Sequence, residues 1–220
     1  MKMMLLVTCL LLAVGCKSTY YSTMEKFGYE KRDLLASRVE DAKTDQIKAR
    51  DQFKTTLQRF QELTGFQGGD LEAKYKQLSS QYDTCKSRAD AVSNRITSVN
   101  SVAQDLFAEW KEELQQYSNP TLRQQSEREL QQSRQRYDQF LVAMRKSEAK
   151  MQPVLTAFHD QVLFLKHNLN AQAIASLQGE TTKIDTDVQS LVRDMDQAIA
   201  EADQFINSMR QGGQGAPNPK

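Results

Sequence analysis

The sequence predicts an all-α protein, an antiparallel bundle or coiled coil of about four long helices. The first observation is a shortage of turn-forming residues, since the 220 residues include only nine Gly and four Pro, several of them in the last nine positions. The second is a composition rich in the strong helix formers Ala, Leu, Gln, Glu, Lys and Arg. The third is a set of apolar stripes in alternating steps of three and four residues, which is typical of helices packed side by side.

Residues 1–15 have the layout of a secretory signal peptide. Its apolar run of about a dozen residues is too short to span roughly 30 Å of membrane as a helix. The ending, through Leu12, Val14, Gly15 and Cys16, resembles the signal of bacterial lipoproteins, in which a peptidase cuts before the cysteine. The resemblance implies that Cys16 is the first residue of the mature chain and carries several acyl chains. Several acyl chains together give stable anchoring in a membrane. A cleaved signal with an incidental cysteine is the alternative.

The residue after the cysteine bears on location. By analogy with the same signals, Lys17 favours sorting to the outer membrane, facing the periplasm, over retention in the inner membrane. Cys9 leaves with the signal and Cys16 carries lipid, so Cys85 has no partner for a disulfide within one chain. We therefore expect Cys85 to be a small core residue.

The first helix is expected to begin near the anchor and to end at about residue 63. Upstream of Leu35 the apolar residues follow a different phase, which indicates a stutter in the heptad pattern. Glycines at positions 65, 68 and 69 then end this helix, and Asp70 is the expected N-cap of the next. The stripe of the first helix, with two polar interruptions, consists of Leu35, Val39, Ala42, Gln46, Ala49, Phe53, Thr56, Phe60 and Leu63.

The second helix carries the clearest stripe, in which no position is charged or an amide. It should end at Ser118 and Asn119, because the residue before a proline avoids helical backbone angles and Pro120 suits a first helical turn. The stripe consists of Leu71, Tyr75, Leu78, Tyr82, Cys85, Ala89, Val92, Ile96, Val99, Ala103, Leu106 and Trp110.

The third helix is predicted to start at Pro120 and to be kinked at Pro153, where a proline frees a backbone carbonyl. A change of stripe phase after Leu169 places the next turn at residues 167–170, with Gly179 as the alternative site. The third stripe consists of Leu130, Ser133, Tyr137, Phe140, Met144, Ser147, Met151, Leu155, Phe158, Val162, Leu165 and Leu169.

The fourth helix should run from this turn to about residue 210. Residues 121–169 carry a net charge of +3 and residues 170–210 one of −4, which predicts that the last two helices lie side by side. Short connections make consecutive helices antiparallel, each about 60 to 70 Å long. Residues 16–210 thus form a single elongated helical bundle domain, followed by a disordered tail at 211–220.

Composition excludes several function classes. The formal net charge is +1, and removal of the leader with its one lysine brings it to zero, so no basic field for nucleic acid exists. The two histidines, His159 and His167, would lie about 12 Å apart on a helix, too far to share a metal ion. Neighbouring carboxylates such as Asp194 and Asp196 do not face each other on a helix. We therefore predict no catalytic residue, no metal site and no cofactor.

Two surfaces are candidates for binding. The four consecutive apolar residues Val162, Leu163, Phe164 and Leu165 cover all sides of a helical turn and, with Phe66, could form an exposed tip for a partner protein. Burial of this turn by neighbouring helices is the alternative. Aromatic and basic residues also interleave after the anchor, where they could contact lipid headgroups or simply start the helix. These membrane-surface candidates are Tyr20, Tyr21, Lys26, Phe27, Tyr29, Lys31 and Arg32.

Several stretches resemble an uncharacterised family of Gram-negative lipoproteins catalogued only as a domain of unknown function. The resemblance covers nearly the whole mature chain and implies a location and a helical architecture, with no established activity or site residues to transfer. The stretches that carry it are Tyr20-Tyr21, residues 25–33, residues 38–42, Gln52-Phe53 and residues 166–174.

Together these patterns predict a lipid-anchored periplasmic scaffold or spacer that binds another envelope protein without catalysis. The membrane is one partner, through Cys16, and an envelope protein of unknown identity is the other. A membrane-surface-binding or membrane-shaping helical module is the alternative, against which the zero net charge argues. The oligomeric state stays open, since heptad seams can be satisfied within or between chains.

Overall fold

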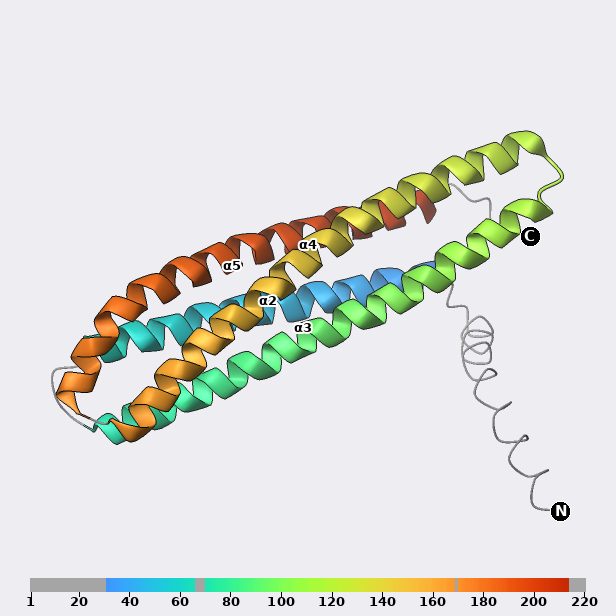
Figure 1. Ribbon diagram of the computed structural model, residues 1–220. Coiled ribbons are helices and arrows are strands. Elements are labelled where there is room, and N and C mark those ends of the chain that lie inside the picture. The colour runs from blue at the N-terminus through green and yellow to red at the C-terminus, as the bar shows by residue number, and fades with distance from the viewer. Residues whose placement is uncertain (1–30, 66–69, 169, 214–220) are drawn as a thin grey trace, which may run out of the picture.

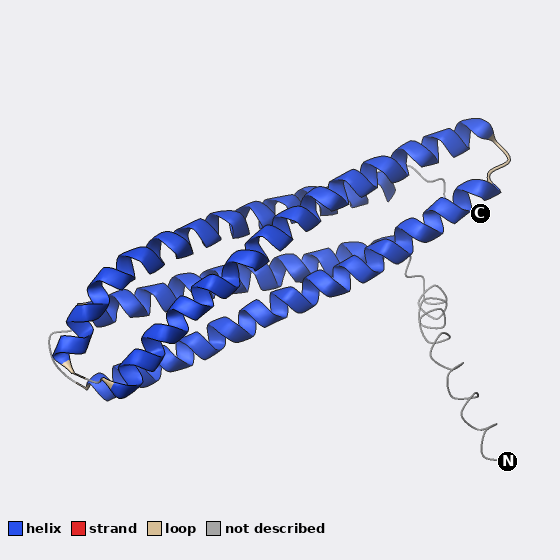
Figure 2. Ribbon diagram, in the orientation of Figure 1, coloured by secondary structure: helices blue, strands red, loops and turns tan. Residues whose placement is uncertain are grey.

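The computed structural model describes residues 31–65, 70–168 and 170–213, and this part of the chain is built of four long α-helices. Figure 2 shows these helices joined by short loops, with no strand in the described ranges. The all-α prediction is therefore confirmed. The elements are α2 (Lys31–Thr64), α3 (Leu71–Glu113), the short 3-10 helix η1 (Leu114–Gln116), α4 (Pro120–His167) and α5 (Ala171–Gly213).

The helices form a closed ring in which each packs against two others. Helix α2 packs on α3 and α5, and α4 packs on the same two, so α2 and α4 are diagonally opposite. Figure 1 shows the connections α2–α3 and α4–α5 at one end of the bundle and the α3–α4 connection at the other. Consecutive helices are thus antiparallel, and α4 lies beside α5 as their opposite net charges predicted.

The core follows the predicted stripes. All nine stripe positions of the first helix are buried in α2, including the polar residues Gln46 and Thr56. In α3 the middle of the stripe is buried, while its ends at Leu71 and Trp110 are half-buried and pack against the core. Residues beside the seams, such as Phe107, are buried as well, because a helix with two neighbours buries a wider face than a two-stranded seam does.

The predicted helix ends are confirmed by their caps. The side chain of Asp70 accepts a hydrogen bond from the backbone N of Ala73 at 2.9 Å. The Asn119 side chain accepts from Thr121 N at 2.9 Å and from Leu122 N at 3.2 Å, with Pro120 in the first turn of α4. These side chains satisfy backbone donors that a helix start leaves unpaired.

The last turn lies at the first of the two sites that the sequence allowed. Helix α4 ends at His167 and α5 begins at Ala171, while Gly179 lies inside α5. Helix α4 continues through Pro153 without interruption, and the kink there stays a prediction. Helix α5 extends to Gly213, three residues past the predicted domain end at 210.

Among the described residues, no helix combines the length and apolarity needed to cross a membrane.

Candidate functional site

The predicted apolar turn near the end of α4 is divided between core and surface. Val162 and Leu165 are 7% and 0% exposed and belong to the core. Leu163 and Phe164 are 45% and 40% exposed. Two side chains of this turn are therefore buried by neighbouring helices, and two are presented to solvent.

The division follows from the heptad pattern. Val162 and Leu165 continue the seam of α4, so the two residues between them lie on the outward side of the helix. The helix end is held by Asn168, whose Nδ2 donates to Phe164 O at 2.9 Å and whose backbone N donates to Leu165 O at 3.2 Å. Leu163 and Phe164 thus project from a capped turn of a long helix.

This turn lies at the end of the bundle that holds the α2–α3 and α4–α5 connections, opposite the start of α2 (Figure 1). Phe66, the other residue predicted at this tip, lies outside the described residues, as does the predicted lipid attachment residue Cys16. The apolar tip is therefore represented in the structure by Leu163 and Phe164.

Most of the membrane-surface candidates also lie outside the described residues, namely those at positions 20, 21, 26, 27 and 29. The two that are described, Lys31 and Arg32, contact neighbouring helices. Lys31 Nζ lies 2.6 Å from Glu109 Oε2 in α3, and Arg32 Nη2 donates to Met209 O in α5 at 2.7 Å. These cations thus hold the start of α2 in the bundle, a role that the local sequence pattern did not indicate.

A surface groove that the sequence analysis missed runs between α2 and α5 toward the same end. It consists of two adjoining depressions of about 400 and 410 Å³ that share Gln61 and Asp185. Gln61 Nε2 donates to Asp185 Oδ1 at 3.3 Å across the groove. Leu57 and Val188 contribute apolar surface to the first depression. Its other lining side chains are largely polar or charged, which suits contact with a polypeptide segment better than enclosure of a small molecule.

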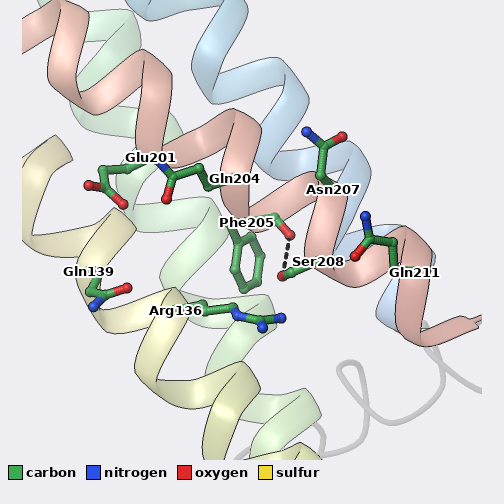
Figure 3. A pocket seen from close by; sticks show the side chains of 8 residues that line it. All are labelled: Arg136, Gln139, Glu201, Gln204, Phe205, Asn207, Ser208 and Gln211. Atoms are coloured by element: carbon green, nitrogen blue, oxygen red, sulfur yellow. Dashed lines mark hydrogen bonds between the residues drawn. The ribbon is translucent and has the colours of Figure 1, made fainter.

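A second cleft, of about 380 Å³, lies between α4 and α5 near the end of α5. Figure 3 shows Arg136 beside Phe205 and Ser208, with Glu201 further along the cleft. The Ser208 hydroxyl donates to Phe205 O at 2.7 Å, so it is bound to its own helix. The lining is amide-rich, and neither of the chain's two histidines contributes to it as a general base. This cleft can bind polar groups but does not assemble a nucleophile with its base.

Most described titratable groups with altered pKa values belong to the core or to interhelical contacts; the exceptions Glu62 and Lys76 are exposed and pair within their own helices. Cys85 is fully buried, and burial raises the pKa of its thiol to about 12, although a hydrogen bond with Thr56 acts in the opposite direction. The thiol is thus a core group, as the sequence predicted. Within the described ranges, no group of three or more His, Cys, Asp or Glu side chains could hold a metal ion.

Asp194 and Asp196 confirm that neighbouring carboxylates on a helix face different partners. Asp194 lies 3.0 Å from Lys146 Nζ and 2.6 Å from Lys150 Nζ, both in α4. Asp196 lies 2.8 Å from Arg50 Nη1 in α2. Burial alone would raise the pKa of Asp194, but the hydrogen bonds from Lys150 and Lys146 outweigh burial and lower it. These carboxylates join helices and do not form a two-carboxylate site.

Comparison with known proteins gives one finding. Residues 20–209 match the model of a family described as a protein of unknown function, DUF2959. No curated protein matches the chain, and no solved structure matches it.

Proposed function

Because the chain belongs to the DUF2959 family of proteins of unknown function, we propose its role from its own architecture: a lipid-anchored periplasmic spacer that presents a protein-binding tip. In this proposal Cys16 carries the acyl chains in the outer membrane, and the helical bundle stands between the membrane and the partner. The partner is another envelope protein, and no chemical reaction is involved.

The observation that carries the proposal is the position of the exposed apolar pair Leu163 and Phe164. The pair lies at the end of the bundle opposite the start of α2, and the chain that precedes α2 leads back to Cys16 (Figure 1). A helix of 48 residues, the length of α4, spans about 70 Å at 1.5 Å per residue. An anchor at one end would therefore hold the apolar pair tens of ångströms from the lipid.

The bundle has the interhelical contacts that a rigid spacer needs. Arg95 Nε in α3 lies 2.8 Å from Asp45 Oδ2 in α2, and Lys43 Nζ in α2 lies 2.9 Å from Asp203 Oδ1 in α5. Such pairs add little stability individually, but together with the continuous core they fix the helices against sliding. A bundle of this kind keeps its two ends at a fixed distance from each other.

The chemistry of the tip favours an apolar acceptor on the partner. A leucine and a phenylalanine that project together from a capped helical turn can insert into an apolar pocket, and phenylalanine is among the residues enriched at protein interfaces. The contact would be small, and membrane anchoring of both proteins would raise their effective concentration. A weak interaction is therefore sufficient in this setting.

Photocrosslinking in living cells tests the proposed tip. A photoreactive residue is placed in turn at Leu163 and Phe164, and at Gln131 as a control, which is exposed on the same helix about 48 Å from Leu163. We expect a discrete adduct from the two tip positions and none from the control. Absence of an adduct from both tip positions, in cells where the protein is acylated and present, would contradict the partner-binding role.

The anchor is tested separately. Mass analysis of the protein from membranes should show a chain that begins at Cys16 and carries acyl chains, and Cys16→Ser should abolish this modification. Chain recovered without acyl groups would contradict the anchored spacer, whatever the crosslinking result.

A further inference from the structure

The α3–α4 hairpin extends beyond the other two helices at the end of the bundle where α2 begins (Figure 1). The ion pair of Lys31 and Glu109, at 2.6 Å, marks the level at which α2 begins. On the facing helices the hydrogen bond from Trp110 Nε1 to Ser126 Oγ, at 2.8 Å, marks nearly the same level. Residues 111–125 therefore project past α2 by about 10 Å, given the rise of a helix. We call this segment the hairpin tip.

Within the hairpin tip, the loop and the first turn of α4 carry fewer charged residues than the rest of the chain. Tyr117 and Leu122 are 42% and 51% exposed, the first in the loop and the second in the first turn of α4. Arg123 is the only charged residue between positions 114 and 126, in a chain of which 26% is charged. Two exposed apolar side chains among uncharged polar residues, with the charged residues 111–113 confined to the base of the tip, suit the boundary between lipid headgroups and acyl chains, where tyrosine is enriched.

The hairpin tip is also held in one conformation. Asn119 caps the start of α4 through Thr121 N and Leu122 N, and Arg123 Nη2 donates to Gln115 Oε1 at 3.2 Å. Because the loop is already ordered, contact with a surface costs little additional conformational entropy.

The length of chain before α2 identifies which surface the tip can reach. Fourteen residues separate Cys16 from Lys31, and even fully extended they span only about 50 Å. An anchor at Cys16 therefore keeps the start of α2 within about 50 Å of the leaflet that holds the acyl chains, and the hairpin tip, which projects from the same end, can reach the lipid. Tethering of this kind makes a second, weak contact effectively intramolecular.

From these observations we propose that the hairpin tip is a second membrane contact, with Tyr117 and Leu122 in the headgroup layer of the phospholipids around the anchor. This inference rests on the proposed function, since it needs the acyl chains at Cys16. The second contact would set the orientation of the bundle. The lipid anchor alone leaves the bundle free to tilt, whereas two contacts at one end hold its long axis away from the membrane plane. Leu163 and Phe164 are then directed away from the membrane.

Depth-dependent quenching tests the contact on the acylated full-length protein. The protein is reconstituted in vesicles of phosphatidylethanolamine and phosphatidylglycerol, with an environment-sensitive fluorophore attached to Tyr117→Cys or Leu122→Cys. Cys85 is fully buried and does not compete for the label. The matched controls are Gln152→Cys, exposed in the middle of α4, and Leu163→Cys at the opposite end. Nitroxide groups near the top of the acyl chains serve as the quencher.

We expect at least twofold quenching at both hairpin positions and none at the two controls. Adding Leu122→Glu to the Tyr117→Cys protein should reduce the quenching at position 117 without changing the melting temperature, because residue 122 is on the surface. Unquenched hairpin probes in protein that floats with the vesicles would overturn the membrane contact and leave the anchored spacer intact. Protein that carries no acyl chains at Cys16 would overturn both.

Discussion

Gln46 in α2 and Ser147 in α4 are joined through the middle of the core. Gln46 Nε2 donates to Ser147 Oγ at 2.7 Å, and both side chains are fully buried. The Ser147 hydroxyl in turn donates to Met144 O at 2.9 Å. The pair links the two diagonal helices of the ring, whereas apolar side chains alone would tolerate several relative heights of α2 and α4. A buried polar pair of this kind contributes to the choice of one packing arrangement.

Removal of one partner of this pair should cost more than removal of both. Ser147→Ala leaves the buried amide of Gln46 without its acceptor, and we expect a loss of about 1–3 kcal/mol in the free energy of unfolding. The double variant with Gln46→Leu places no polar group in the core and should recover most of this loss. Urea denaturation of residues 17–220 measures both. A double variant less stable than Ser147→Ala alone would contradict the prediction.

The contact between Asp194 and its two lysines should make stability depend on acid pH. Hydrogen bonds from Lys150 and Lys146 lower the pKa of Asp194 in the folded chain against the burial that raises it. A carboxyl with a lowered folded pKa stabilises the fold above its unfolded value, near pH 4, and this stabilisation is lost as the pH falls through the folded pKa. Asp194→Asn should therefore lower stability by about 1 kcal/mol at pH 7, since both lysines are partly exposed.

The pH dependence of the Asp194→Asn effect tests whether this carboxylate stabilises the fold above or below its pKa. The difference in urea midpoint between the parent chain and Asp194→Asn should be constant from pH 8 to about pH 5 and shrink below about pH 4. Asp203→Asn is the matched control, because Asp203 also contacts a lysine of a neighbouring helix but is largely exposed. Its effect should stay below about 0.5 kcal/mol at every pH. A difference for Asp194→Asn that grows on acidification would contradict the assignment.

The helical architecture could be predicted because local rules and packing agree along nearly the whole chain. Val39, Phe53 and Phe60 repeat at heptad spacing and are buried, and Asp70 and Asn119 cap the helices that follow them. Each of these residues has one favourable place, on the inner face of a helix or at its start. The turn at residues 167–170 followed from the phase of the stripe for the same reason.

The binding surfaces were less predictable because exposure depends on three-dimensional neighbours. The heptad stripe distinguishes Val162 and Leu165 from the two residues between them, but whether a neighbouring helix covers Leu163 and Phe164 depends on how the ring of helices is arranged. Tyr117 and Leu122 lie beside a proline and polar residues and gave no apolar run. Their importance comes from the hairpin projecting past α2, which depends on the relative heights of the helices. No local pattern encodes that height.

The buried thiol of Cys85 should be almost unreactive in the folded chain. Burial raises its pKa to about 12, so the thiolate that reacts with disulfide reagents is scarce at pH 8, and the side chain is fully buried. Labelling of residues 17–220 by an aromatic disulfide should be at least 100-fold slower in buffer than in denaturing urea. Leu163→Cys, which adds an exposed thiol, should react rapidly at one site per chain. Fast native labelling of the parent chain would show that α2 and α3 separate readily.

Two phenylalanines of α4 that lie less than two turns apart should differ strongly in the cost of truncation. Phe158 is fully buried, and its ring centroid lies 5.1 Å from that of Phe60 and 6.3 Å from that of Phe53. Phe158→Ala should therefore cost about 3–5 kcal/mol in the free energy of unfolding, through lost burial and the cavity left behind. Phe164 is 40% exposed, and Phe164→Ala should cost less than about 1 kcal/mol.

The Phe158→Ala and Phe164→Ala variants also separate a structural role of this region from a binding role. Phe164→Ala should leave the urea midpoint nearly unchanged yet reduce the adduct obtained from a photoreactive residue at position 163, because the partner loses an apolar anchor. Phe158→Ala, in contrast, should lower the midpoint strongly. A large loss of stability from Phe164→Ala would mean that this side chain serves the bundle itself, and the exposed pair would then no longer support a partner-binding tip.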